Sequence, residues 1–166
     1  MGAGEKDRLF KAAQSEQDPE LRQEAVRQLG VMGAQEELWT LYQKESSLDV
    51  KKQILNAMFV GGNATRMIDL AKTEQNADLR RSAVRNLGLM GRSKTGTALN
   101  EIYASDKDPE VRKAVLQALF LQNNAEDLVA LARKEQDPAM KKAIVEKLSL
   151  MKSKVATDYL IELLNK

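Results

Sequence analysis

Apolar positions along the chain follow a helical pattern that restarts five times. The stretch from Leu21 to Gly33 places apolar residues three and four positions apart, which is the spacing of one face of an amphipathic helix. Aligned on its first apolar residue, the stretch recurs at spacings of 29, 29, 32 and 29 residues. The five copies begin at Leu21, Val50, Leu79, Val111 and Met140. No segment alternates with a period of two, so the pattern predicts helices alone.

Each copy carries its own helix-start signal. Three positions before the first apolar residue lies a side chain whose oxygen can accept a hydrogen bond from a free backbone N–H of the first helical turn. These capping residues are Asp18, Ser47, Asn76, Asp108 and Asp137. The three prolines of the chain follow three of these caps at the first helical position, where a missing N–H costs nothing. The sequence therefore predicts five well-defined helix starts.

A second helix precedes each capped one. Its apolar pairs, such as Leu38-Trp39 followed by Leu41-Tyr42, also lie on one helical face. We call the first helix of each pair helix A and the capped one helix B. The chain then contains six A helices and five B helices. The last A helix has no B partner, and its apolar set is Leu160, Ile161, Leu163 and Leu164.

A longer period is superimposed on the repeat. Phe59 and Phe120, 61 residues apart, occupy a B-helix position at which other repeats carry Gly30 and Gly88. Tyr residues at 42 and 103 show the same spacing in the A helices. This alternation of large and small side chains predicts a duplicated four-helix unit whose repeats interlock by size.

The motif Asp-Pro-Glu-Leu-Arg at 18–22, followed by Ala-Val and then Leu-Gly-x-Met-Gly, resembles the bacterial HEAT repeat, including the short type of phycobilin-lyase-like proteins. The likeness extends over essentially the whole chain. It implies an all-α fold, an armadillo-like right-handed α-solenoid of antiparallel helix pairs with eleven helices in five and a half repeats. The repeats would span residues 5–33, 34–62, 63–91, 92–123 and 124–152, with a terminal helix at 154–166, in a single domain over 1–166. By the same resemblance, the B helices would line the concave side.

Composition removes several classes of chemistry. The 166 residues include no Cys and no His, which excludes disulfides, Cys/His metal sites, thiol nucleophiles and His-based proton relays. We therefore expect a protein that is not an enzyme, with no catalytic residue, metal or cofactor. No apolar run approaches the roughly 20 residues that span a bilayer, and the first residues lack the apolar core of a signal peptide. A cytoplasmic location is favoured, although the compartment stays open.

Basic residues occupy two different positions on the B helices. Arg22 and its equivalents lie inside the apolar arc, which predicts a packed stem whose head group pairs with a carboxylate or with helix-end carbonyls. The next position and one four residues further lie on the polar side. Together with two bordering aromatic rings they define the candidate binding residues: Arg27, Lys52, Phe59, Arg81, Arg85, Lys113, Phe120 and Lys142.

Such a basic and aromatic stripe predicts a scaffold that binds a peptide or protein partner on its concave face. The alternative for the side chains themselves is that they form an ordinary solvated surface. Nucleic acid is a less favoured partner, because the net charge is only +2 and few aromatic rings are free to stack on bases. A lyase-like or chaperone-like role on a tetrapyrrole-carrying protein rests on the resemblance alone. We expect a monomer, with end-to-end association left open.

Overall fold

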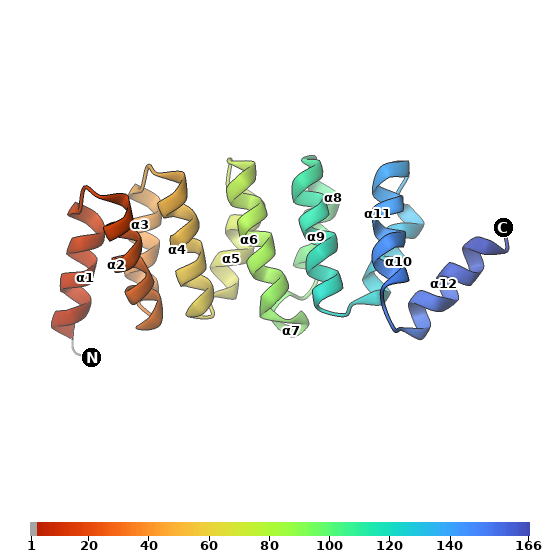
Figure 1. Cartoon of the computed structure of the whole chain (residues 1–166), viewed down its shortest axis with the longest axis horizontal. Helices are drawn as coiled ribbons and strands as arrows, with labels where there is room; N and C mark the ends of the chain where they lie inside the picture. Colours follow the sequence, from red (N-terminus) through yellow and green to blue (C-terminus); the bar gives the residue numbers. More distant parts are fainter. Residues whose placement is uncertain (1–2) are drawn as a thin grey trace. The chain divides into compact units, whose positions relative to one another are not determined.

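The computed structural model describes residues 3–166, and within that range all regular secondary structure is helical (Figure 1). The helices are α1 (Ala3–Ser15), α2 (Pro19–Val31), α3 (Gln35–Lys44), α4 (Leu48–Val60), α5 (Ala64–Thr73), α6 (Ala77–Met90), α7 (Arg92–Thr95), α8 (Ala98–Ser105), α9 (Pro109–Leu121), α10 (Ala125–Lys134), α11 (Pro138–Ser149) and α12 (Lys154–Leu164). The expected all-α solenoid of helix pairs is confirmed. The B helices are α2, α4, α6, α9 and α11.

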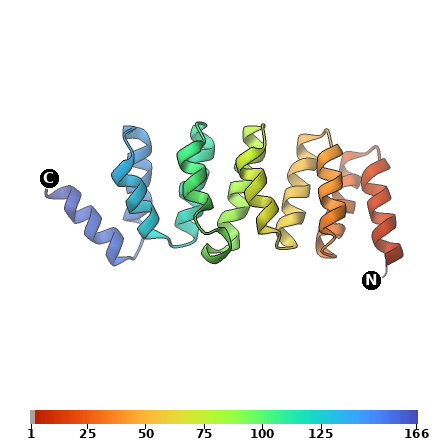
Figure 2. The same cartoon turned by 180° about the vertical axis from the view of Figure 1, so that it is seen from behind.

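The chain forms two compact units, and the boundary between them falls inside α6. Unit 1 ends at Asn86 and unit 2 comprises Leu87–Lys166. In unit 1, the A helices α1, α3 and α5 form one layer and the B helices the other, as the two opposite views show (Figures 1 and 2). In unit 2, helices α8 and α10 lie behind α9 and α11 in Figure 1, and α12 packs against both α10 and α11 at the C-terminal end. The single domain expected over 1–166 stays a prediction.

The five predicted caps start the five B helices. Asp18 accepts a hydrogen bond from the backbone N–H of Glu20 at 2.9 Å, and Asp108 accepts from Glu110 at 2.8 Å. The other three caps make the same kind of bond: Ser47 accepts from Val50, Asn76 from Leu79, and Asp137 from Ala139. Each cap satisfies a backbone donor that the helix itself leaves free, so the B helices begin where the sequence indicates.

One short helix was not expected. Helix α7 is a single turn, Arg92–Thr95, that begins with the basic stretch Arg92-Ser93-Lys94. It lies between two glycines with positive φ, Gly91 at 90° and Gly96 at 53°. Glycine has no Cβ, so it adopts this left-handed backbone region without steric cost. The extra turn accommodates the three residues by which the spacing between the third and fourth copies exceeds 29.

Glycines in two B helices allow the neighbouring B helix to approach closely. A Cβ added to Gly30 would lie 2.7 Å from the Cβ of Ala57 in α4. In unit 2, a Cβ on Gly88 would lie 2.8 Å from the Cα and the Cβ of Ala118 in α9. Real Cβ atoms do not come so close, so these two helix pairs depend on the missing side chain. The predicted alternation of small and large residues thus sets the spacing between B helices.

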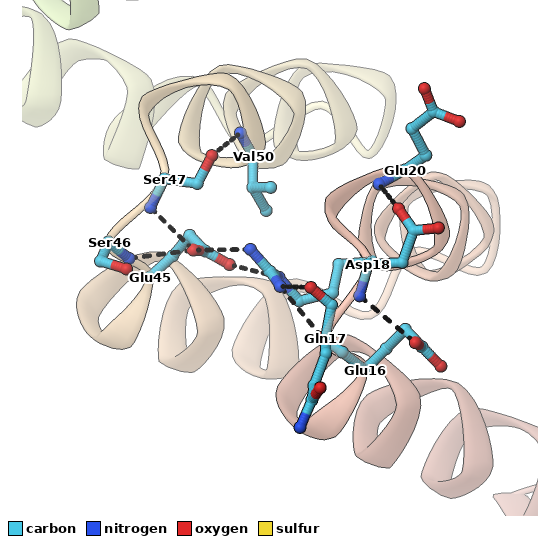
Figure 3. A network of polar contacts seen from close by, with 9 residues as sticks. Glu16, Gln17, Asp18, Glu20, Glu45, Ser46, Ser47 and Val50 are labelled. Carbon is cyan, nitrogen blue, oxygen red and sulfur yellow. Dashed lines mark hydrogen bonds and ion pairs between the residues drawn. The ribbon is translucent and has the colours of Figure 1, made fainter.

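Arg22, the first of the basic residues on the apolar side of the B helices, is paired as predicted. Arg22 donates to the carboxylate of Glu45 at 3.2 Å and to the carbonyl oxygens of Glu16 and Gln17. Glu45 also accepts from the backbone N–H groups of Ser46 and Ser47, and Figure 3 shows it facing this turn before α4. The carboxylate therefore joins the second helix of one repeat to the start of the next B helix.

Three further basic residues of this set have equivalent contacts. Arg80 donates to the carbonyl oxygens of Glu74 and Gln75. The side chain of Arg112 donates to Glu135 at 2.9 Å and lies over the ring of Tyr103, while Lys51 lies over the ring of Tyr42. The acid that pairs with Arg22 or Arg112 comes 23 residues later in the chain.

Two expectations about apolar residues were wrong. Leu21 was assigned to the packed face, but it is 54% exposed, because no described helix covers the outer side of α2. In the last helix, α12, the buried residues are Ala156 and Tyr159, whereas Ile161 and Leu164 face solvent. The expected face is therefore displaced by one residue, since Tyr159 rather than Leu160 is buried.

Candidate partner-binding site

The candidate residues of unit 1 lie on three B helices, and their side chains reach solvent to different degrees. Arg27 and Arg85 are exposed, and Arg27 forms an ion pair with Glu24 one turn earlier. Lys52 and Phe59 are half-buried on α4. Unit 1 therefore carries a cationic B-helix surface with one aromatic ring at its edge.

Arg81 of α6 has one ion-pair contact and one donor atom without a partner. Its guanidinium lies 3.8 Å from the carboxylate of Asp78. Its Nε is buried and has no hydrogen-bond partner in the part of the chain that the structure describes. One donor of this side chain is therefore unused within the described residues.

In unit 2, the candidate residues surround a groove between α9 and α11, with a volume of about 570 Å³. We call it the α9–α11 groove. Its lining consists of Lys113, Leu116, Gln117, Ala139, Lys142, Ala143, Glu146, Lys147 and Leu150. The structure thus brings Lys113 and Lys142, two of the predicted residues, to opposite walls of one depression.

The groove opens beside Phe120, which occupies the glycine position of the interlocking B helices. Where Gly30 stands, the next B helix approaches to direct backbone contact. Phe120 is half-buried at the same position in α9. A ring cannot be accommodated at that distance, so α11 lies further away and a groove remains between the helices. Phe120 borders the candidate site because its ring prevents α11 from packing closely on α9.

Three cations line the α9–α11 groove, and they differ in how strongly they are engaged. Lys113 lies 3.5 Å from the carboxylate of Glu110, with both side chains exposed. Lys142 is exposed and has no hydrogen-bond or ion-pair partner among residues 3–166. Lys147 donates to the side-chain oxygen of Gln117, and its ammonium lies 5.2 Å from the centre of the Phe120 ring.

Sequence reasoning missed Lys147. It lies seven residues after the first apolar residue of its repeat, where the other four copies carry Gln28, Ala57, Asn86 and Ala118. In unit 1, the side-chain nitrogen of Asn86 on α6 lies 3.4 Å from the side-chain oxygen of Asn56 on α4. This contact joins the same two repeat positions as the Lys147–Gln117 bond, but between shorter side chains. The sequence did contain a signal for Lys147, because only its repeat carries a cation at this position.

The lining of the groove combines leucine and alanine side chains with three lysines and one glutamate, Glu146. Within residues 3–166, no cluster of three or more acidic side chains is suited to holding a metal ion. Over the same range, no helix has the length and apolar character needed to cross a membrane. The groove offers hydrophobic contact and positive charge to a ligand.

Comparison with known families agrees with the repeat pattern. Residues 64–126 match the family model described as HEAT repeats. The match supports a HEAT-repeat protein. The matched segment includes helices α5 to α9, which carry Arg81, Arg85, Lys113 and Phe120 among the candidate residues. No curated protein matches the chain.

Proposed function

We propose that this chain is a non-enzymatic binding module that recognises a peptide or a protein through the exposed face of its B helices. HEAT repeats commonly serve as protein-interaction scaffolds, and stacked repeats present an extended surface that is already ordered before binding. The finer resemblance to phycobilin-lyase-like repeats stays a prediction about the sequence subtype.

The observation that carries the proposal is the α9–α11 groove. A preformed depression with apolar side chains in its lining and unpaired positive charge is suited to a side chain or short segment of another protein. Its volume of about 570 Å³ lies within the usual range of ligand sites, roughly 300–1,000 Å³. Lys142 supplies a cation that no neighbouring group neutralises in the described chain, so an acidic partner would gain a new ion pair without breaking an existing one.

Protein is a better partner than nucleic acid for this surface. Binding to a nucleic acid depends on many phosphate contacts, whereas the groove offers three lysines offset by one glutamate. Bases stack on open aromatic faces, but Lys147 lies over the ring of Phe120, the aromatic residue at this site. These contacts favour an acidic peptide over a polyphosphate chain.

The test is a comparison of captured partners. The full chain and the variant Lys113→Glu/Lys142→Glu are immobilised as baits in an extract of the source cells, and the bound proteins and nucleic acids are quantified. We expect a protein that the wild type retains and that the variant loses by at least about tenfold, because two attractive charges become repulsive ones.

A matched control separates the site from general charge. Lys107→Glu/Lys134→Glu makes the same change in charge at two exposed positions of unit 2 that lie outside the groove, and it should retain the partner. Equal losses with both double variants, or specific capture of nucleic acid alone, would contradict the proposal.

A further inference from the structure

The B helices carry a second recurrent surface feature, which the basic stripe does not include. Ten residues after the first apolar residue of each repeat there is an aliphatic side chain that faces solvent in all five copies. We call these residues the aliphatic row: Val31, Val60, Leu89, Leu121 and Leu150. Their exposed fractions are 63%, 63%, 60%, 52% and 70%. Single exposed aliphatic residues are ordinary on protein surfaces, but the same exposed position in every repeat is a pattern.

Helix capping does not account for the row. The B helices α2, α4 and α9 end in a Schellman motif. In this motif, a backbone N–H just beyond the helix donates to the carbonyl oxygen of the residue five positions earlier. In α2, the N–H of Ala34 donates to the carbonyl oxygen of Leu29 at 3.0 Å. The apolar contact of that motif joins these same two residues, and both are buried. Val31 lies between them and points to solvent. The row is therefore not needed to end the helices.

Packing between repeats does not account for it either. The Gly88 position, directly before Leu89, is buried against Ala118 of α9, whereas each member of the row keeps more than half of its surface open. In unit 2, Leu150 also lines the α9–α11 groove. Leu150 thus connects the row to the candidate site.

Resting on the proposed function, we propose that the unit 2 part of the aliphatic row, Leu89, Leu121 and Leu150, is the docking strip for one amphipathic helix of a partner protein. This helix lies across α6, α9 and α11, with aliphatic side chains on the row and acidic side chains on the flank that faces the groove lysines. The proposal names the class of partner segment, an acidic amphipathic helix, and the face on which it binds.

The spacing of the row favours a helix over an extended peptide. Closely packed helices have axes about 8–10 Å apart, and we expect the groove between α9 and α11 to place Leu121 and Leu150 towards the wider end of that range. Residues seven apart on one face of a helix are separated by about 10.5 Å. Same-face residues of a strand repeat at about 6.6 Å and 13 Å instead, so they fall out of step with the row.

The charges determine which way the partner helix faces. Lys147 lies three residues before Leu150, and Lys142 lies two turns before it, both on the wall of the groove. A helix about 10 Å in diameter that rests on the row has one flank above these ammonium groups. Acidic residues on that flank would meet Lys142, which has no partner within residues 3–166, without displacing an existing contact.

The test uses the full chain and a labelled synthetic helix of about 18 residues, with leucines seven residues apart on one face and glutamates on one flank. Binding is followed by fluorescence anisotropy. We expect saturable binding that weakens at least about tenfold in Leu121→Ser/Leu150→Ser, because two apolar contacts are lost. We also expect it to weaken as salt increases. Surface serines at these exposed sites should leave the fold intact, which circular dichroism verifies.

Two matched controls make the outcome specific. Ile161→Ser/Leu164→Ser removes two equally exposed aliphatic residues from α12, outside the row, and it should bind like the wild type. A peptide of the same composition with its leucines placed five residues apart should bind at least about tenfold less tightly. Equal binding of the two peptides, or of wild type and Leu121→Ser/Leu150→Ser, overturns the docking strip. The captured partner would still be lost with the lysine variant, so the proposed function is tested separately.

Discussion

At the scale of single residues, a repeated acid lies at each junction between repeats. Glu135 accepts hydrogen bonds from the hydroxyl group of Tyr103 and from the side chain of Arg112, and it also bonds the backbone N–H of Asp137. Its equivalent 61 residues earlier, Glu74, accepts from the hydroxyl group of Tyr42. The 61-residue period seen in the sequence is therefore repeated in the hydrogen bonds.

Glu135 gives the fold a dependence on acid. Burial alone raises the pKa of this carboxyl, but hydrogen bonds from Tyr103 and Asp137 and the charge of Arg112 outweigh it and lower the pKa below its ordinary value of 4.5. A lowered carboxyl pKa stabilises the folded state above that ordinary value, and this stability is lost as the pH falls below it. We therefore expect stability to decline progressively on acidification below about pH 4.5.

The variant Glu135→Gln tests this contribution. At pH 7 it should lower the free energy of unfolding by about 1–3 kcal/mol, because a largely buried carboxylate loses charge-assisted bonds. The difference from wild type should shrink towards pH 3 in urea titrations, since both side chains are then neutral. Glu162→Gln, which alters the exposed pair with Arg133, is the matched control and should have little effect. A pH-independent difference would contradict this assignment.

At the scale of helices, the glycine positions determine which B helices touch and which leave a groove. Gly30 and Gly88 permit close contact, whereas Phe120 holds α9 and α11 apart. The same position therefore stabilises packing in one repeat and leaves a groove in another. This division of roles follows from side-chain volume alone.

Gly30→Ala should destabilise the chain. An alanine gains up to about 1 kcal/mol in helix propensity, but its Cβ would lie 2.7–3.0 Å from the Cβ, the Cα and the carbonyl oxygen of Ala57. Forcing the backbones apart costs about 1–3 kcal/mol, so a net loss is expected in urea denaturation. Gly4→Ala in α1, with no atom within 4 Å, should be neutral or stabilising. Unchanged or increased stability of Gly30→Ala would show that the close approach of α2 and α4 does not require a glycine at this position.

At the scale of the whole molecule, a solenoid gains its stability from contacts between neighbouring repeats. Helix α6 continues without a break from unit 1 into unit 2. We propose that the chain unfolds as the single domain expected from the sequence, because a fully helical junction cannot be half melted without loss of its hydrogen bonds.

Trp39, the only tryptophan of the chain, provides the test. It stacks on Tyr42 and lies beneath the guanidinium of Arg66, 4.0 Å away, so its fluorescence reports on unit 1. Far-ultraviolet circular dichroism reports on all helices. Urea transitions followed by the two probes should coincide if unfolding is cooperative. A fluorescence transition displaced from the dichroism transition would assign the two units separate stabilities.

The sequence by itself determined the long helices and their starts. A cap such as Asp18 acts on a backbone N–H two residues away, and amphipathic spacing is a property of one helix, so both can be predicted from neighbours in the chain. The candidate residues Lys113, Lys142 and Phe120 were chosen from the sequence, because they break or repeat a pattern that is visible in the five copies.

Only the tertiary structure decided where these residues meet. The α9–α11 groove depends on the separation between two helices, which Phe120 sets by its volume. Lys147 enters it because it reaches Gln117, 30 residues earlier. Glu45, the carboxylate that pairs with Arg22, is 23 residues away in the chain and could not be predicted from a local pattern. The displaced buried face of α12 could not be predicted from a local pattern either. These features depend on packing across repeats, which reduces the exposure of some side chains and leaves the aliphatic row facing solvent.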